Sequence, residues 1–192
     1  SCHTREIWIL FLMIMTADTI LYMIMVHLVP RAVDAGLSSA TAVTVLTVTG
    51  LSNMVCSIIG GAVGDRFGAR RTYIGSMALL TFSMIWLIGS DSLWMFYVFA
   101  VAFGVGNGGW FPQVPVLAAK IFGTKYLGSI YAAILVGAGI GGMIGPILAG
   151  YIFDTTGSYK IAFVIAAAVA IAAVLFAVAL SDRSRTCSEG NT

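Results

Sequence analysis

One acidic side chain, Asp18, stands in the middle of an apolar run that covers residues 7–29. An ionised carboxylate at the centre of a bilayer costs about 2.5–3.5 kcal/mol, so such a residue is expected to face a cavity or a polar partner. Tyr22 follows one helical turn later on the same face and is within reach of a hydrogen bond. Proton coupling or contact with a polar substrate is the functional interpretation. A protonated Asp18 that hydrogen-bonds a neighbouring helix is the structural alternative.

Three amides and one tryptophan form a second set of candidate residues for a substrate or proton pathway. Asn53 and Asn107 lie near the centres of two further apolar runs, and Gln113 follows toward the inner end of the second one. An amide in hydrocarbon needs a hydrogen-bond partner, so each is expected to face protein or a water-filled cavity. Cavity lining and structural bonding are both open for these amides. Trp110 is either a gate over the cavity or a side chain that fills space.

The sequence does not favour an enzyme. The only histidines are His3 and His27, and His27 is expected to pack near the outer end of its helix. The nearest match to an intramembrane serine protease is the segment 50–53, which lacks the last glycine of G-x-S-G. The three cysteines have neither disulfide nor metal spacing. We therefore expect no catalytic residue, no metal and no cofactor.

Six apolar runs must position these residues. Of the 192 residues, 59% are hydrophobic and 9% charged, whereas a soluble domain has about 25% charged residues. A bilayer is crossed by roughly 20 apolar residues, and runs of that length lie near 7–29, 41–63, 73–90, 93–117, 128–152 and 161–181. The sequence predicts an all-α integral membrane bundle over 1–181, followed by a polar cytoplasmic tail at 182–192. A net charge of +2 gives no reason to expect a nucleic-acid partner.

The basic residues predict the orientation of this bundle in the membrane. If the N-terminus is cytoplasmic, eight of the ten Lys and Arg residues lie inside, and only Arg31 and Lys160 lie outside. The positive-inside rule then places both termini in the cytoplasm, with the cell membrane as the expected location. The chain opens on Ser1 rather than Met, and we expect it to be a fragment of a longer protein.

A repeat with an offset of 89 residues divides the six runs into two units of three. It relates the segment Gly61–Gly68 to Gly150–Gly157, which share the pattern G-x-x-x-D-x-x-G. An odd number of helices in each unit gives the units opposite orientations, as in many secondary transporters. Small residues recur every four positions at 100–108 and 133–149. Such stripes let helix backbones pack closely.

The segment from Gly61 to Arg71 resembles the signature loop of the major facilitator superfamily, G-x-x-x-D-R-x-G-R-R between two helices. The residues that carry this likeness are Gly61, Asp65, Arg66, Gly68, Arg70 and Arg71, while Ala69 departs from the pattern. The segment 139–159 resembles the fifth helix of the C-terminal half in that superfamily. His27–Pro30 and the segment 34–42 are similar to the monocarboxylate and oxalate–formate branch.

The resemblance implies a fold of twelve helices in two halves, of which this chain supplies the C-terminal six. It also implies a missing N-terminal half, alternating access to a central cavity, and a cytoplasmic latch at Asp65 to Arg71. The branch suggests a small organic anion as the substrate. Asn53 and Ser57 stand where monocarboxylate members place an acidic and a basic residue, however, and no Lys or Arg lies inside any run. An anion would need its counter-charge from the missing half; otherwise the substrate is not an anion.

The leading hypothesis is a secondary transporter that moves a small solute across the lipid bilayer, with proton coupling at Asp18. The alternatives are a half-transporter remnant that does not transport and a six-helix protein that works only as a homodimer.

Overall fold

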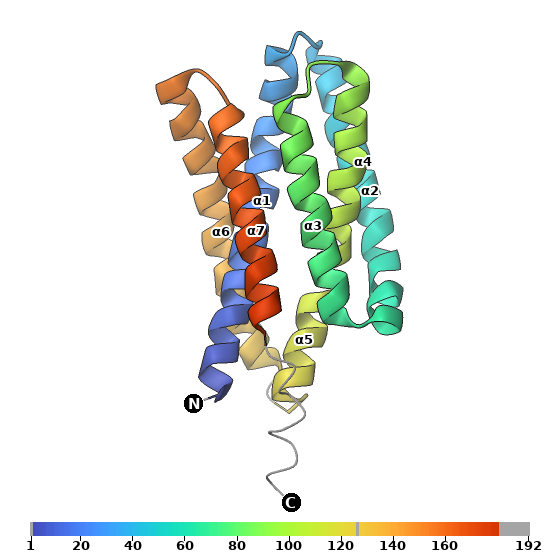
Figure 1. The fold of residues 1–192 in the computed structure, drawn as a ribbon, viewed down its shortest axis with the longest axis vertical. Coiled ribbons are helices and arrows are strands. Elements are labelled where there is room, and N and C mark those ends of the chain that lie inside the picture. Colours follow the sequence, from blue (N-terminus) through green and yellow to red (C-terminus); the bar gives the residue numbers. More distant parts are fainter. Residues whose placement is uncertain (1, 126, 181–192) are drawn as a thin grey trace, which may run out of the picture.

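The computed structural model describes residues 2–125 and 127–180, and its regular elements there are all α-helices (Figure 1). The helices are α1 (Cys2–Asp34), α2 (Ser39–Phe67), α3 (Ala69–Ile88), α4 (Leu93–Trp110), α5 (Gln113–Phe122), α6 (Leu127–Thr156) and α7 (Lys160–Ala179). Six segments of this described part are long and apolar enough to cross a membrane, because α4 and α5 together form one of them. The predicted all-α bundle is confirmed.

Several helices are longer than the apolar runs that predict them. The helix α1 has 33 residues, which gives a length of about 50 Å at 1.5 Å per residue. A hydrocarbon core is about 30 Å thick, so the polar ends of such a helix project beyond it. The fourth run is interrupted between α4 and α5 at Phe111 and Pro112. Proline has no backbone N–H to continue the helical ladder.

The two repeat units are interleaved rather than side by side. The offset of 89 residues relates α1 to α4–α5, α2 to α6 and α3 to α7. The helix α1 packs mainly on α6, and α2 packs mainly on α4, so the first helix of each unit contacts the second helix of the other. The third helices, α3 and α7, contact each other. The predicted inverted repeat therefore organises the packing of the bundle.

A glycine with positive φ ends the second helix of each unit. Gly68 has φ 93° and Gly157 has φ 65°, a backbone conformation that glycine adopts without the steric cost of a side chain. Gly68 alone separates α2 from α3. The signature segment, predicted to be a loop, is thus helical except at this residue. The start of α1 and the end of α7 lie at the same end of the bundle (Figure 1).

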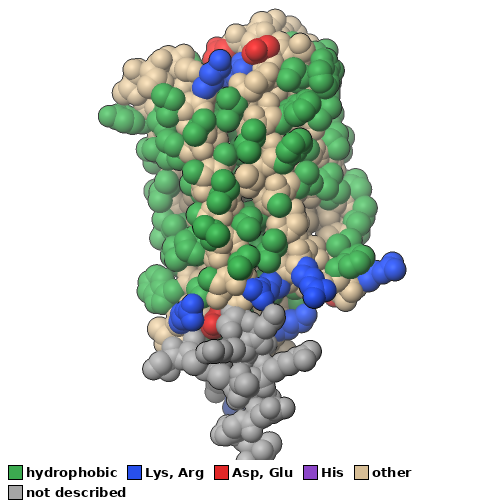
Figure 2. All heavy atoms as spheres, in the orientation of Figure 1, with side chains coloured by type: hydrophobic (Ala, Val, Ile, Leu, Met, Phe, Trp, Pro, Cys, Tyr) green, Lys and Arg blue, Asp and Glu red, His purple; other side chains and the backbone are tan. Residues whose placement is uncertain are grey.

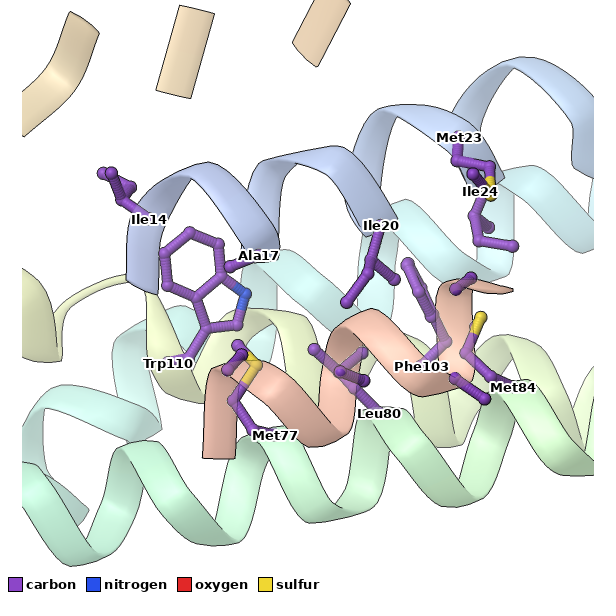
Figure 3. Packing of buried hydrophobic residues seen from close by; sticks show 14 of the residues in the cluster. Ile14, Ala17, Ile20, Met23, Ile24, Met77, Leu80, Met84, Phe103 and Trp110 are labelled. Atoms are coloured by element: carbon purple, nitrogen blue, oxygen red, sulfur yellow. The ribbon is translucent and has the colours of Figure 1, made fainter. Parts of the chain in front are cut away.

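The buried core lies where α1, α3, α4 and α7 meet. Trp110 lies beside Ile14 and Ala17 of α1, and Met77 of α3 approaches it from below (Figure 3). The outer surface is also apolar, and the side chains of Ile58 and Met143 are 77% and 68% exposed. On the face shown in Figure 2, charged side chains gather at the two ends of the molecule and leave an apolar band between them. Such a band is suited to lipid.

Candidate functional site

Asp18 lines a pocket of about 260 Å³ between α1 and α6, together with Tyr22, Ala138, Gly139 and Gly142. The side chain is 5% exposed. Its Oδ2 atom is buried, and no described residue gives it a hydrogen bond. A buried polar atom without a partner is uncommon in native structures, where most such atoms are satisfied. The carboxyl group therefore has a capacity for binding that the described helices do not use.

Glycines of α6 bring the two helices that form this pocket into backbone contact. A Cβ atom added at Gly137 would lie 2.8 Å from the carbonyl oxygen of Phe11, and one at Gly141 would overlap the carbonyl of Met15. Gly145 has the same relation to Thr19. The predicted stripe of small residues on α6 is thus the contact surface for α1. The hydroxyl of Thr19 donates to the carbonyl of Met15 within α1, at 2.7 Å, and is not available to Asp18.

Tyr22 lines the same pocket but makes no hydrogen bond with Asp18 among the described contacts. Its side chain is 47% exposed. The ring lies against Gly142, where an added Cβ atom would be 3.0 Å from Cδ2 of Tyr22. The phenol is therefore placed by α6, and it forms an aromatic wall of the pocket rather than a partner for the carboxyl group.

Asn107 and Trp110 pair with each other in the core. The indole Nε1 of Trp110 donates to Oδ1 of Asn107 at 2.9 Å, and both residues are buried. The ring of Trp110 also meets Tyr73 edge to face, with centroids 6.2 Å apart. In this structure Trp110 fills the space between helices and has its polar atom satisfied.

The other two amides lie on either side of the contact between α2 and α4–α5. Gln113 is 2% exposed, and its Nε2 donates to the carbonyls of Gly60 at 2.8 Å and Gly109 at 3.2 Å. This arrangement is a structural bond between helices. Asn53 is half-buried, and its Oδ1 accepts a bond of 3.4 Å from the hydroxyl of Ser57 on the same helix.

The signature segment is attached to the bundle through Arg70. Its guanidinium donates to the carbonyls of Ala177 at 2.9 Å and Val178 at 2.6 Å, at the C-terminal end of α7. A cation at that end of a helix also interacts favourably with the helix dipole. Asp65 and Arg66 are exposed, and the ion pair recorded among the described residues does not involve them. The guanidinium of Arg66 lies 5.5 Å from the ring of Phe67.

Two polar contacts at the end of the bundle where α1 ends are not evident from the spacing of residues in the sequence. Arg31 is buried and donates to the carbonyl of Ser90 at 2.9 Å and to Oδ1 of Asp91 at 3.2 Å. His27 donates from Nε2 to the carbonyl of Pro146 at 3.1 Å. The only sequence signal for either contact is a polar residue near the end of an apolar run.

The ring of His27 also packs on Tyr159, with centroids 5.1 Å apart. Burial, with the nearby carboxylates of Asp34 and Asp154, raises the pKa of Tyr159. His27 thus packs near the end of α1, as expected.

The repeat offset relates the residues of the pocket to residues of the α2–α4 contact. Asp18 corresponds to Asn107, and Gly142 corresponds to Asn53. This correspondence is a signal that could have directed attention to Gly142 from the sequence alone. Asp18 and Tyr22 line the described pocket at the α1–α6 contact, and Gln113 bonds across the symmetry-related contact of α2 with α4–α5, whereas the pair of Asn107 and Trp110 is buried in the core.

Comparisons with known proteins agree with this architecture. Monocarboxylate transporter 12 of Rattus norvegicus is 29% identical over 144 residues, which cover 73% of this chain and 30% of that protein. Multidrug resistance protein B homolog of Mycobacterium tuberculosis (strain ATCC 25618 / H37Rv) is 27% identical over 168 residues, covering 86% of this chain and 31% of that protein. The chain thus spans about a third of the length of these relatives.

Solved transporter structures share the fold. The structure of peptide transporter POT in complex with sulfate has a TM-score of 0.82 at 20% identity, covering 91% of this chain and 37% of that one. The structure of tetrameric PepTSo2 in the I4 space group has a TM-score of 0.83 at 18% identity, covering 96% and 44%. A family model described as Major Facilitator Superfamily matches residues 7–192. The chain belongs to the major facilitator superfamily.

Proposed function

We propose that the protein containing this chain is a secondary active transporter, which moves a small solute by alternating access and couples transport to protons through Asp18. Membership of a transporter superfamily supports the general activity. The observation that carries the coupling is the buried, unpartnered Oδ2 of Asp18 in an open pocket. A carboxyl oxygen without a hydrogen-bond partner among the described residues can take up and release a proton when water reaches it.

The α1–α6 contact supports a site that changes its access to water. The glycines at 137, 141 and 145 leave no side chains of their own between the two backbones. The pocket lies directly beside this contact, since Gly142 and Asp18 both line it. A small shift of α6 relative to α1 would therefore alter how far Asp18 is covered.

The charge distribution supports an orientation with both termini in the cytoplasm. At the end of the bundle where α1 begins, the described basic residues are Arg5, Arg66, Arg70, Arg71, Lys120 and Lys125. Arg31 and Lys160 lie at the other end. The excess of basic residues marks the cytoplasmic side, and the cell membrane remains the proposed location. An N-terminal six-helix half remains the proposed partner.

The test uses the complete protein in vesicles. A thermal-shift screen of small solutes first identifies one that stabilises the protein, and its accumulation is then driven by an imposed pH gradient. Asp18→Asn, which mimics the protonated carboxyl, is expected to abolish accumulation driven by the pH gradient. Asp34→Asn is the matched control, because Asp34 lies on the same helix with an exposed side chain. Unchanged gradient-driven accumulation in Asp18→Asn would return Asp18 to a purely structural role.

A further inference from the structure

The middle of the described bundle contains one acidic residue and no Lys or Arg. The basic residues of the described helices lie near helix ends: Arg5, Arg31, Arg66, Arg70, Arg71, Lys120 and Lys160. His27 is the other titratable residue of α1 away from its ends, apart from Tyr22, and its Nε2 already donates to the carbonyl of Pro146. The pocket therefore holds a potential negative charge with no counter-charge from the described residues.

The wall of the pocket offers hydrogen-bond acceptors and an aromatic ring. Gly142 lines it, and the residue four positions later is Pro146, which has no N–H. The carbonyl of Gly142 therefore lacks its intrahelical donor. Oδ2 of Asp18 is a second acceptor without a partner. Tyr22 adds an exposed ring, and the faces of aromatic rings attract cations.

From this chemistry we infer that the Asp18 pocket binds the charged nitrogen of a small organic cation, an ammonium compound or a protonated amine, as the transported substrate. This inference rests on the proposed transport function. The volume of about 260 Å³ admits a compact cation, and the small residues Ala138 and Gly139 let it approach the carboxylate. An anion would face an uncompensated negative charge, so the site differs from that of an organic-anion carrier.

Proton and cation compete for the same carboxyl group. Asp18 is neutralised either by a proton on its carboxylate or by the bound cation, so binding of the cation requires release of the proton. Across a transport cycle this exclusion exchanges one proton for one monovalent cation. The proposed coupling is thereby explained, because a single carboxyl group binds both the substrate and the proton.

The groups that surround Asp18 are phenols rather than charges. Tyr73 of α3 and Tyr131 of α6 are the ionisable side chains of those helices near enough to Asp18 to influence it. The hydroxyl of Tyr73 donates to the carbonyl of Met13 at 3.0 Å and is thereby engaged. Among the described residues, the charged groups of α2, α4–α5, α6 and α7 lie at the ends of these helices. The pH dependence of cation binding should therefore report Asp18 itself.

The test is equilibrium binding of radiolabelled tetramethylammonium to the complete purified protein. This probe does not titrate, so any effect of pH belongs to the protein. Affinity is expected to fall at least about tenfold from about pH 8 to about pH 5, as the proton displaces the cation. Asp18→Asn should abolish specific binding, and Asp34→Asn should bind as the unmodified protein does.

A pair of substitutions at Tyr22 tests the aromatic wall separately. Tyr22→Phe keeps the ring and should bind normally, whereas Tyr22→Leu should weaken binding roughly 2- to 30-fold. Absence of tetramethylammonium binding, or equal binding by Asp18→Asn, would overturn the inference. Binding of lactate that depends on Asp18 would overturn it as well. The proton-coupling proposal is judged by accumulation of the separately identified solute, so each proposal fails on its own measurement.

Discussion

The α1–α6 contact and the α2–α4 contact are related by the repeat. The polar residues at corresponding positions of α1 and α4 nevertheless differ in whether they have a hydrogen-bond partner. On α4, Asn107 accepts a hydrogen bond from Trp110 of the same helix. At the α1–α6 contact the corresponding residue is Asp18, whose Oδ2 has no described partner and which lines a pocket. A polar side chain at this position can therefore find a hydrogen-bond partner in this fold, and the missing partner is particular to Asp18.

The feature that the two contacts share is close packing over glycine. Gly104 and Gly108 of α4 meet the backbone of α2, as Gly141 and Gly145 of α6 meet the backbone of α1. In both cases the glycines come from the second repeat unit. Packing over glycine holds the helices together at both contacts. The missing hydrogen bond of Asp18 distinguishes the candidate site.

The largest effect is expected from filling the glycine contacts. Gly141→Val and Gly108→Val each place side-chain atoms on a facing carbonyl, that of Met15 or Asn53. Overpacking of this kind costs about 1–3 kcal/mol or more. Both variants should therefore lose folded protein in fluorescence-detected gel filtration.

Repeat-related controls are available on α6 and α2, which take part in the two contacts. A Cβ atom added at Gly139 of α6 or at Gly50 of α2 would meet nothing within 4 Å. Gly139→Val and Gly50→Val should elute as the unmodified protein does. A loss confined to one of the two contacts would show that the contacts are not equivalent. An equal loss in the controls would show that filling the contacts is not the cause of the loss.

The next largest change in stability should have opposite signs at Asn107 and at Asp18, which correspond to each other in the repeat. Asn107→Leu leaves the buried indole N–H of Trp110 without its partner, which costs about 1–3 kcal/mol. Asp18→Leu removes a buried atom that has no partner, so its melting temperature should rise. Thermal unfolding of the complete protein in detergent measures both. Equal destabilisation would mean that Asp18 has a structural partner after all.

A smaller effect is expected from Gln113, whose repeat mate is the apolar Ile24. Gln113→Met keeps the length of the side chain but removes two hydrogen bonds to backbone carbonyls. The loss should be about 1–2 kcal/mol. Ser57→Ala on α2 is the comparison, because its hydroxyl bonds within its own helix, and a change within about 0.5 kcal/mol is expected. A larger loss for Ser57→Ala would reverse this ranking.

The smallest effect on stability, but a large one on transport, is expected at the exposed Asp65. Asp65→Asn should reduce the rate of transport and leave membrane expression intact, since its proposed latch partner lies outside the described residues. Asp154 is its repeat mate at the other end of the bundle, and Asp154→Asn should transport normally. Uptake assays with quantified surface expression compare the two. Normal kinetics in Asp65→Asn would exclude an essential latch.

Features with a local period could be predicted from the sequence. The apolar runs predict the spans, and the spacing of Gly137, Gly141 and Gly145 predicts a packing stripe. The repeat also predicts which helices correspond to each other. These inferences succeed because helix geometry relates residues three or four positions apart directly to one face.

Contacts between distant segments could not be predicted in this way. Arg70 binds Val178, Arg31 binds Asp91, and the ring of Tyr22 lies against Gly142. Each depends on how two helices meet, and a single sequence does not contain that information. The pocket itself depends on the same geometry, so the sequence indicates Asp18 but not the missing hydrogen bond or the small residues around it. The predicted tail at 182–192 lies outside the described residues.

The interleaving of the repeats has a consequence for biogenesis. The main packing partner of α1 is α6, which is complete only at Thr156, more than a hundred residues after α1 ends at Asp34. At roughly 5–20 residues per second, synthesis of the intervening chain takes on the order of ten seconds. During that time Asp18 is in the membrane or the insertion machinery without the helix that encloses its pocket. Folding of this chain is therefore expected to depend on which lipids or proteins contact α1 and its Asp18 before α6 has been synthesised.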